Sequence, residues 1–310
     1  MIKVENGLFV LHTERTTYAF AVKESGQLEH LYYGEKLDVG EDERLALSHK
    51  AVNPIGCGCV YGKEWPNLCL EEFCLETSGV GKGDTRTPFV EVTFADGSHT
   101  TDFVYESYEM VEGAPALTQL PSAYDETGTV KTLRVSLREQ KEPLRMDLFY
   151  TVYPACDCIV RGARLVHLGD VADGAKPIRI DRLMSAQLDF ETSGYRFIRF
   201  HGDWAHEMNR YEQVVEAGGV YAESRTGNSS NHANPFVMIA SSNTTEEMGE
   251  CYASNLIYSG NHKESLEVDA HGKSRFLTGI LPDGFSWQLE PGASFEAPQA
   301  VLCYSGEGYR

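Results

Sequence analysis

The sequence predicts an all-β protein, a large antiparallel sandwich of two sheets with few or no helices. Three observations predict this fold class. Runs of apolar, β-branched and aromatic residues, separated by turn residues, follow one another along all 310 residues. No window of a dozen residues has a sustained apolar repeat at helical spacing, apart from a weak candidate at 42–50. So many strands without helices between them exclude doubly wound and (β/α) barrel folds.

The first half of the chain contains two apolar runs and two predicted hairpins. The apolar runs lie at 8–11 and 18–22, and a Glu-Ser-Gly turn follows the second. An Asp-Gly turn at 95–98 is typical of a hairpin, and a second, polar turn occupies 139–143. The hairpin strands predicted around these turns are 89–94 with 100–111, and 132–137 with 145–153.

The second half continues the series of strands. They are predicted at 158–168, 178–190, 195–200, 220–224, 236–241, 251–258, 266–269 and 275–280. A last pair, 285–289 and 300–304, is predicted to be joined by a Glu-Pro-Gly-Ala turn. No Pro/Ser-rich linker divides the chain, so we expect one domain.

The stretch 48–83 is a long irregular excursion from this pattern. It holds four of the eight cysteines, six glycines and two prolines. Trp65, Leu68, Leu70 and Phe73 make it too apolar for disorder, so we expect it to fold against the rest of the protein.

The charge balance excludes several classes of partner. Lys and Arg number 27 against 46 Asp and Glu, a formal net charge of -19, which repels nucleic acid and anionic membrane surfaces. No apolar run approaches the roughly 20 residues that span a bilayer, and residues 1–10 do not resemble a signal peptide. We therefore expect a cytoplasmic protein with reduced thiols and no membrane or nucleic-acid partner.

Metal and nucleophile signals are weak. His201 and His206 are five residues apart with Glu207 after the second, and cysteine pairs are one residue apart, which fits no standard zinc spacing. No G-x-S-x-G motif occurs, and the glycine-rich segment 79–83 lacks the spacing of a phosphate-binding loop. We expect no metal, no cofactor and a simple turn at 79–83.

Sugar recognition is the chemistry that the residues favour. A pyranose has an apolar face and a rim of hydroxyls, so its sites combine an aromatic platform with charged and amide groups. Trp204 lies within ten residues of a set that supplies them, namely His201, Asp203, His206, Glu207 and Arg210. Trp65, with Glu64 and Asn67, is a second candidate. The alternative is that each tryptophan fills a core or an interface, and we expect Trp287, which alternates in a strand, to lie in the core.

A polar run at 223–236 separates two strands. Its Asn and Ser side chains can satisfy either the backbone or a ligand, and structural capping is the favoured role.

Five separated motifs resemble the N-terminal domain of glycoside hydrolase family 36, the bacterial α-galactosidases. Residues 83–88 resemble G-D-F-R-x-P, residues 200–207 resemble x-x-G-x-W-x-R-E, and residues 223–236 resemble E-S-R-R-G-x-S-S-H-x-x-N-P-F. Residues 258–261 also match, as do 289–295 together with Tyr304 and Ser305. Order and spacing agree over essentially the whole chain.

The resemblance implies a galactose mutarotase-like β-supersandwich at 1–303, with 304–310 beginning a linker to a (β/α)8 barrel. In the family that barrel holds both catalytic aspartates of a retaining mechanism. The resemblance therefore implies no catalytic residue in this chain, an α-galactoside ligand, and oligomer contacts. It places Trp204 and Trp65 at the rim of the sugar pocket. With them we take His201, Glu207 and Arg210 as candidate substrate-binding residues.

The sequence departs from the family pattern at several positions. His206, Thr226 and Asn231 stand where the family has Arg, Arg and His. The first loop lacks the family's Asp and Arg, with His49 or Lys50 nearest the Asp and a different sequence at 53–58. A second hypothesis is therefore a free-standing carbohydrate-binding or mutarotase-like sandwich, with His201 and Glu207 as its acid and base. A third is an assembly scaffold without sugar affinity.

Overall fold

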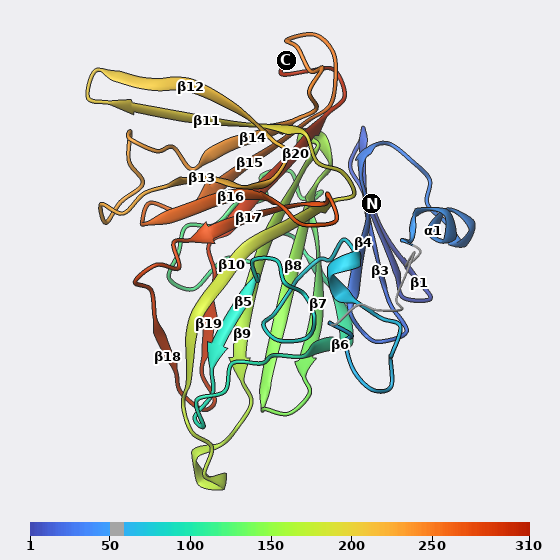
Figure 1. Cartoon of the computed structure of the whole chain (residues 1–310), viewed down its shortest axis with the longest axis vertical. Helices are drawn as coiled ribbons and strands as arrows, with labels where there is room; N and C mark the ends of the chain where they lie inside the picture. The colour runs from blue at the N-terminus through green and yellow to red at the C-terminus, as the bar shows by residue number, and fades with distance from the viewer. Residues whose placement is uncertain (50–58) are drawn as a thin grey trace.

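The computed structural model describes residues 1–49 and 59–310 and contains three antiparallel sheets (Figure 1). The four-stranded sheet comprises β1 (Ile2–Glu5), β2 (Leu8–His12), β3 (Thr16–Val22) and β4 (Leu28–Glu35). The six-stranded sheet comprises β5 (Val90–Thr93), β10 (Ile178–Phe190), β13 (Gly218–Glu223), β16 (His262–Val268), β17 (Ser274–Ile280) and β18 (Trp287–Leu289).

The third sheet has ten strands and forms one whole layer of the molecule. It comprises β6 (Phe103–Glu112), β7 (Lys131–Glu139), β8 (Leu144–Tyr153), β9 (Cys158–His167), β11 (Tyr195–Asp203), β12 (His206–Val215), β14 (Phe236–Ala240), β15 (Cys251–Ile257), β19 (Ser294–Glu296) and β20 (Gln299–Ser305). Its order is β12-β11-β14-β15-β20-β9-β8-β7-β6, and β19 also pairs with β9.

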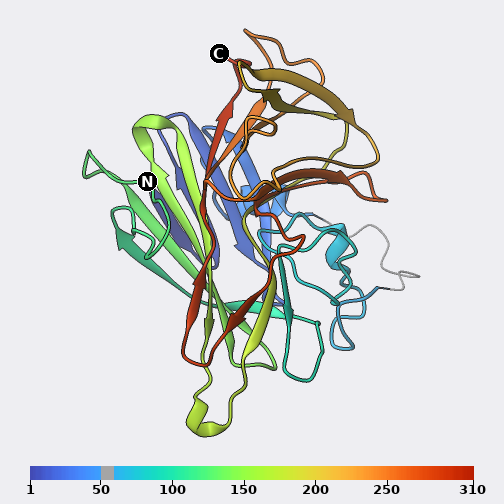
Figure 2. The same ribbon diagram turned by 90° about the vertical axis from the view of Figure 1, so that its left-hand side faces the viewer.

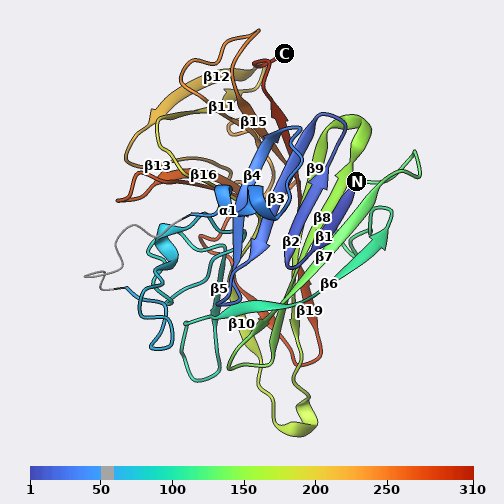
Figure 3. The ribbon, with the colours of Figure 1, turned by 90° about the vertical axis from the view of Figure 1, so that its right-hand side faces the viewer.

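The two smaller sheets pack against the ten-stranded sheet around one continuous apolar core. Phe20 of β3 stacks on Tyr150 of β8, with ring centroids 4.7 Å apart. Leu188 of β10 and Ile239 of β14 belong to the same buried cluster. Figures 2 and 3 show the sheet β1–β4 lying over β7–β9. The predicted all-β antiparallel fold is confirmed, with a second layer divided into two sheets.

The predicted pairing of strands is correct in the middle of the chain and wrong at two places. β7 and β8 form the predicted hairpin. The Asp-Gly turn at 95–98 does not join a hairpin, because β5 pairs with β10 while β6 pairs with β7. The last predicted pair is also absent, since β18 pairs with β10 and β20 pairs with β15 and β9. A local turn signal says nothing about a partner distant in sequence.

Helices are few, as the sequence predicts. The helix α1 (Glu41–Leu47) overlaps the weak helical candidate at 42–50 and begins with three acidic residues, which stabilise its N-terminal turn. The three short 3₁₀ turns are η1 (Leu70–Glu72), η2 (Pro154–Cys156) and η3 (Val171–Asp173). In the described part of the chain no helix is long and apolar enough to cross a membrane.

The motif at 83–88 is part of a buried ionic cluster. Arg275 of β17 bonds the Asp84 carboxylate at 3.0 Å and Asp189 of β10 at 2.8 Å. Arg86 bonds Asp84 through Nε at 2.8 Å. Gly83 has φ +84°, and a Cβ there would lie 2.1 Å from the Cys59 carbonyl oxygen. The motif therefore holds the irregular excursion against β10 and β17 of the six-stranded sheet.

The excursion folds against the sandwich as expected, although Lys50 and residues 53–58 lie outside the described residues. Leu70, Phe73 and Leu75 form a small apolar cluster, with Tyr61 and Leu68 packed on it. The backbone of Leu75 donates to the Asp189 carboxylate at 3.0 Å. This local core explains the apolar content of an otherwise irregular segment.

Candidate functional site

The candidate site lies at the tip of the β11–β12 hairpin. Asp203 and His206 are the last paired residues, so Trp204 and Ala205 form a two-residue turn between them. Trp204 is 86% exposed, the highest value of any large apolar side chain in the described residues. A tryptophan presented to solvent in this way is available to a ligand or to another protein surface.

The tip keeps its shape through its own acidic side chains. Asp203 accepts a hydrogen bond from the Trp204 backbone at 2.7 Å, and Glu207 accepts one from the Ala205 backbone at 3.0 Å. Ala205 has φ +59°, a left-handed conformation that these two bonds help to hold. Glu207 is therefore placed beside Trp204, as the sequence predicts, with one carboxylate oxygen committed to the turn.

The polar loop 224–235 lies against the hairpin, because the strand after it, β14, pairs with β11. Asn234 donates from its backbone to the Phe200 carbonyl at 3.0 Å. The His201 ring approaches the His232 carbonyl with Nδ1 at 2.7 Å, and since a carbonyl only accepts, Nδ1 is the donor.

A groove of about 290 Å³ separates the hairpin from this loop. Its lining residues are Phe200, Glu207, Met208, Ser229, Ser230, Asn231, Asn234 and Pro235. It thus combines one carboxylate, an aromatic ring and several hydroxyl and amide groups, which is the mixture that a sugar requires. Two of the sequence motifs, 200–207 and 223–236, meet at this groove.

The motif at 258–261 holds the polar loop 224–235 through hydrogen bonds. Asn261 accepts a hydrogen bond from the Gly227 backbone at 2.7 Å, and the Ser259 carbonyl accepts one from Ser229 at 2.8 Å. His262 Nε2 donates to the Ala233 carbonyl at 3.1 Å. The other ring nitrogen of His262 contacts Glu264 at 2.7 Å, and burial raises the pKa of Glu264 to about 7. The loop is therefore anchored to β16 from below.

Side chains of the run 223–236 bond the backbone, as expected, and several residues of the run also line the groove. Asn234 accepts from the Phe236 backbone at 2.9 Å, and Ser224 donates to the Asn228 carbonyl at 2.6 Å. Ser229, Ser230, Asn231 and Asn234 also line the groove. The sequence shows these residues as polar, but only the pairing of β14 with β11 places them opposite Glu207.

Of the five predicted substrate-binding residues, Glu207 alone lines the groove among the described residues. Arg210 contacts Glu212 at 2.7 Å and Glu246 at 3.4 Å, and its guanidinium lies 4.4 Å from the Tyr309 ring centroid. Trp65 is partly buried and belongs to the segment 59–88, which Figures 1 and 3 show beside β4 and β5, apart from the β11–β12 hairpin. His201 and Trp204 share the β11–β12 hairpin with Glu207 but do not line the groove.

The core position predicted for Trp287 is wrong. Its side chain is 48% exposed on β18, a strand at the edge of its sheet. It packs against Phe295, with ring centroids 5.4 Å apart. Trp287 does lie in a strand, but an edge strand of three residues leaves its outer face open to solvent.

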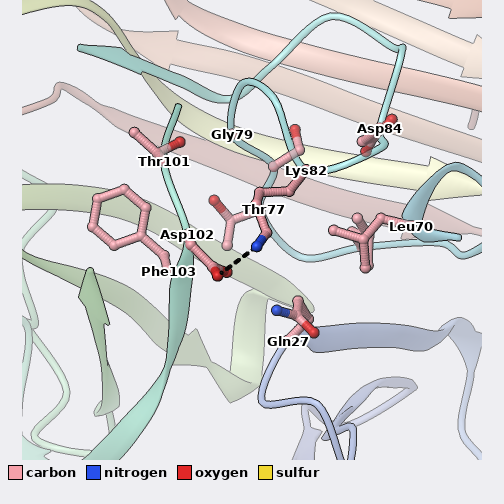
Figure 4. Close-up of a pocket in the computed structure, with 11 residues that line it drawn as sticks. Gln27, Leu70, Thr77, Gly79, Lys82, Asp84, Thr101, Asp102 and Phe103 are labelled. Carbon is pink, nitrogen blue, oxygen red and sulfur yellow. Dashed lines mark ion pairs between the residues drawn. The ribbon is translucent and has the colours of Figure 1, made fainter. Parts of the chain in front are cut away.

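The glycine-rich segment 79–83 borders a small pocket of about 30 Å³ (Figure 4). Lys82 points into it and pairs with Asp102 at 3.0 Å, so its charge is already neutralised. Lys82 also lies 4.3 Å from the Tyr61 ring centroid. This space is about the size of one water molecule, and the segment acts as a turn between buried elements.

Acid–base or metal chemistry finds little support in the described residues. No hydrogen bond or ion pair in the described part of the chain joins His201 to Glu207. Among residues 1–49 and 59–310 no three His, Cys, Asp or Glu side chains gather in a metal-binding arrangement.

Gly202 offers a test of the tip. A Cβ at this position would lie 2.4 Å from the His206 carbonyl oxygen and 2.6 Å from Glu207 Cα. We expect Gly202→Ala to force the hairpin tip apart and lower the free energy of unfolding by about 1–3 kcal/mol, measured by urea denaturation. Gly219→Ala is the matched control, because a Cβ there meets its nearest atom at 3.5 Å. Equal stabilities of the two variants would contradict the packing described for the tip.

Comparison with known proteins places these features in a family context. Residues 26–290 match the model of the glycosyl hydrolase family 36 N-terminal domain. The chain is 35% identical over 307 residues to α-galactosidase 2 of Hypocrea jecorina, an alignment that covers 99% of this chain and 39% of that protein.

Solved structures give the same result. The α-galactosidase of Lactobacillus brevis superposes with a TM-score of 0.89 at 34% identity, over 97% of this chain and 40% of that one. A variant of the α-galactosidase AgaA of Geobacillus stearothermophilus in complex with raffinose superposes with a TM-score of 0.90 at 31% identity, over 97% and 41% of the two chains. The chain therefore spans about 40% of the length of these relatives.

Proposed function

Since the chain belongs to glycoside hydrolase family 36 as its N-terminal domain, we propose that it serves a retaining α-galactosidase as the non-catalytic domain. The whole enzyme would hydrolyse terminal α-galactosyl residues of oligosaccharides. Both catalytic aspartates would lie in a (β/α)8 barrel joined after residue 303, with 304–310 as the start of the linker. The observation that carries the proposal is the match of nearly the whole chain to about 40% of several α-galactosidases.

The hairpin tip is the part of this domain that we assign to substrate. Trp204 would supply an apolar platform for a sugar face, while His201 and Glu207 would bond hydroxyl groups at the rim. The exposure of Trp204 and the adjoining groove support this assignment. Trp65 and Arg210 stay weaker candidates, because Trp65 belongs to a segment apart from the hairpin and Arg210 is already paired with two carboxylates.

Assembly and location are part of the same proposal. A homo-oligomer of the full enzyme would cover exposed apolar side chains of β12 and β13, among them Met208, Tyr211 and Tyr221. We propose a cytoplasmic location, because eight cysteines in 310 residues are too dilute for the disulfide framework of a small secreted protein.

Trp204→Ala in the full enzyme tests the site. We expect kcat/KM for raffinose to fall about 10- to 100-fold, because losing a buried apolar contact of about 1.5–3 kcal/mol weakens transition-state binding. Trp287→Ala is the control, since Trp287 is also exposed but lies on the other sheet. If both variants keep the wild-type kcat/KM, Trp204 has no role in substrate binding.

The 310-residue chain by itself separates the enzyme-domain proposal from a free-standing sugar-binding protein. We expect no hydrolysis of p-nitrophenyl α-galactoside and at most weak galactose binding, followed by tryptophan fluorescence. Hydrolysis at the rate of a complete α-galactosidase would overturn the proposal. Micromolar galactose affinity would favour the free-standing protein.

A further inference from the structure

Two cysteines face each other across neighbouring strands of the ten-stranded sheet. Cys158, the first residue of β9, is directly opposite Cys303 of β20 in the antiparallel register. Directly opposed residues point to the same face of a sheet, with Cα atoms about 4.5–5.5 Å apart. A disulfide typically joins Cα atoms about 4.4–6.8 Å apart, so the two sulfurs can bond without movement of the strands.

The pair lies at a surface that small molecules can reach. Cys303 and the exposed Cys156 both line an open groove of about 630 Å³. Cys158 and Cys303 are partly exposed, and the Cys158 thiol donates to the Cys156 carbonyl at 3.0 Å. Asp157, between Cys156 and Cys158, is held by Thr13 at 2.7 Å, so the backbone at this point is fixed.

The two thiols also influence each other chemically. The interaction with Cys158 lowers the pKa of Cys303, while the interaction with Cys303 and burial raise the pKa of Cys158. Cys303 lines the groove and Cys158 does not, so a small disulfide reaches Cys303 first, and thiolates are the species that attack disulfides. In this pair one sulfur is suited to attack and the other to resolve the product.

We propose that Cys158 and Cys303 are a dithiol–disulfide couple that low-molecular-weight disulfides oxidise. The Cys303 thiolate attacks one sulfur of the small disulfide, forming a mixed disulfide and releasing the other half as a thiolate. Cys158 then loses its proton and attacks the Cys303 sulfur, which closes the protein disulfide and releases the second half. The protein loses two thiol hydrogens and two electrons, and the small disulfide is reduced to two thiols.

The proposed bond would join β20, the last strand in the sequence, to β9, which comes from the middle of the chain. β20 lies between β15 and β9, so a covalent link to β9 would hold it in register. The link would also restrict the unfolded chain, which raises the stability of the oxidised form.

Oxidised glutathione and the purified 310-residue chain provide the experiment. Cleavage before Asp157 separates Cys156 from Cys158, so mass spectrometry of non-reduced peptides identifies which sulfurs are joined. We expect a Cys158–Cys303 peptide in the wild type and in the control Cys156→Ser. We also expect the oxidised wild type to melt at a higher temperature than the reduced form.

Removal of Cys158 should abolish the cross-link under the proposal. Cys158→Ser should retain glutathione on Cys303, form no cross-link and show no rise in melting temperature. A cross-link between Cys156 and Cys303, or wild-type protein carrying glutathione on Cys158 and Cys303 separately, would overturn the proposal. Neither outcome bears on the proposed role in an α-galactosidase.

Discussion

Arg275→Met is expected to lower the free energy of unfolding by about 3–5 kcal/mol, as measured by urea denaturation at pH 7. Arg275 is nearly fully buried and bonds Asp84 and Asp189 at 3.0 and 2.8 Å. Methionine keeps much of the volume but leaves two buried carboxylates with less positive charge between them. The loss of a partner from a buried ion pair costs far more than the pair contributes on balance.

The pH dependence of this effect follows from Asp84. Burial alone would raise the pKa of Asp84, but the guanidinium groups of Arg275 and Arg86 hold it below its usual value. The stabilisation from Asp84 is therefore complete above its unfolded pKa of about 3.9 and is lost as the pH falls through the lower, folded pKa. We expect the deficit of Arg275→Met to shrink below about pH 4.

Arg138→Met is the matched control for this prediction. Arg138 pairs with Glu106 at 2.9 Å on the surface of the ten-stranded sheet, where a salt bridge contributes less than about 1 kcal/mol. If Arg275→Met does not fold, Arg275→Lys keeps the charge but loses the two-pronged contact, and a smaller loss is expected. A loss below 1 kcal/mol for Arg275→Met would show that the cluster is not an important support.

Glu76→Gln is expected to cost a similar amount, about 3–5 kcal/mol, through a second buried cluster. The Glu76 carboxylate accepts hydrogen bonds from Tyr18 at 2.8 Å and from Tyr150 at 2.7 Å. It also contacts Arg161 at 3.1 Å and His30 at 2.7 Å. The uncharged glutamine amide would leave the Arg161 guanidinium buried without its anion, between the four-stranded and the ten-stranded sheet.

The sign of its pH dependence is also defined. Burial would raise the pKa of Glu76, but Arg161 and the hydrogen bonds lower it below its usual value. The stabilisation is present above the unfolded pKa of about 4.3 and disappears as the pH falls through the folded pKa. Below about pH 4.3 the wild type should therefore lose stability more steeply than Glu76→Gln.

The control for this second prediction is Glu112→Gln, since Glu112 is highly exposed and forms a single ion pair within the described residues, with Lys131 at 3.5 Å. We expect it to leave the unfolding transition unchanged. Tyr150→Phe removes one hydrogen bond to the carboxylate and should cost about 1.5–3 kcal/mol. Equal pH profiles for wild type and Glu76→Gln would refute the role given to Glu76.

Most strands could be predicted because their residues alternate or form apolar runs. β12 could not be, because most of its residues are polar and exposed on both faces, and only its pairing with β11 defines it. The same limit explains the wrong partner assigned to β5, which pairs with β10 far along the chain. Strand formation is local in sequence, whereas strand pairing is not.

The site shows the same division. His201, Trp204 and Glu207 fall within seven residues, so their proximity follows from a short hairpin. The groove depends on Asn234 and its neighbours, which a separate pairing of strands brings to the hairpin. Similarly, the motif residue Asp84 has a clear role only beside Arg275, which is distant in sequence.

The position of β20 in the middle of the ten-stranded sheet determines when the protein can fold during synthesis. Until residues 299–305 leave the ribosome, β9 and β15 each have an unpaired edge facing the gap that β20 later fills. Until then the sheet consists of two separate halves, and its exposed edges can pair wrongly with other chains. The sandwich can be completed only after this last strand has been synthesised, and its completion is slow because the closing contacts join distant parts of the chain.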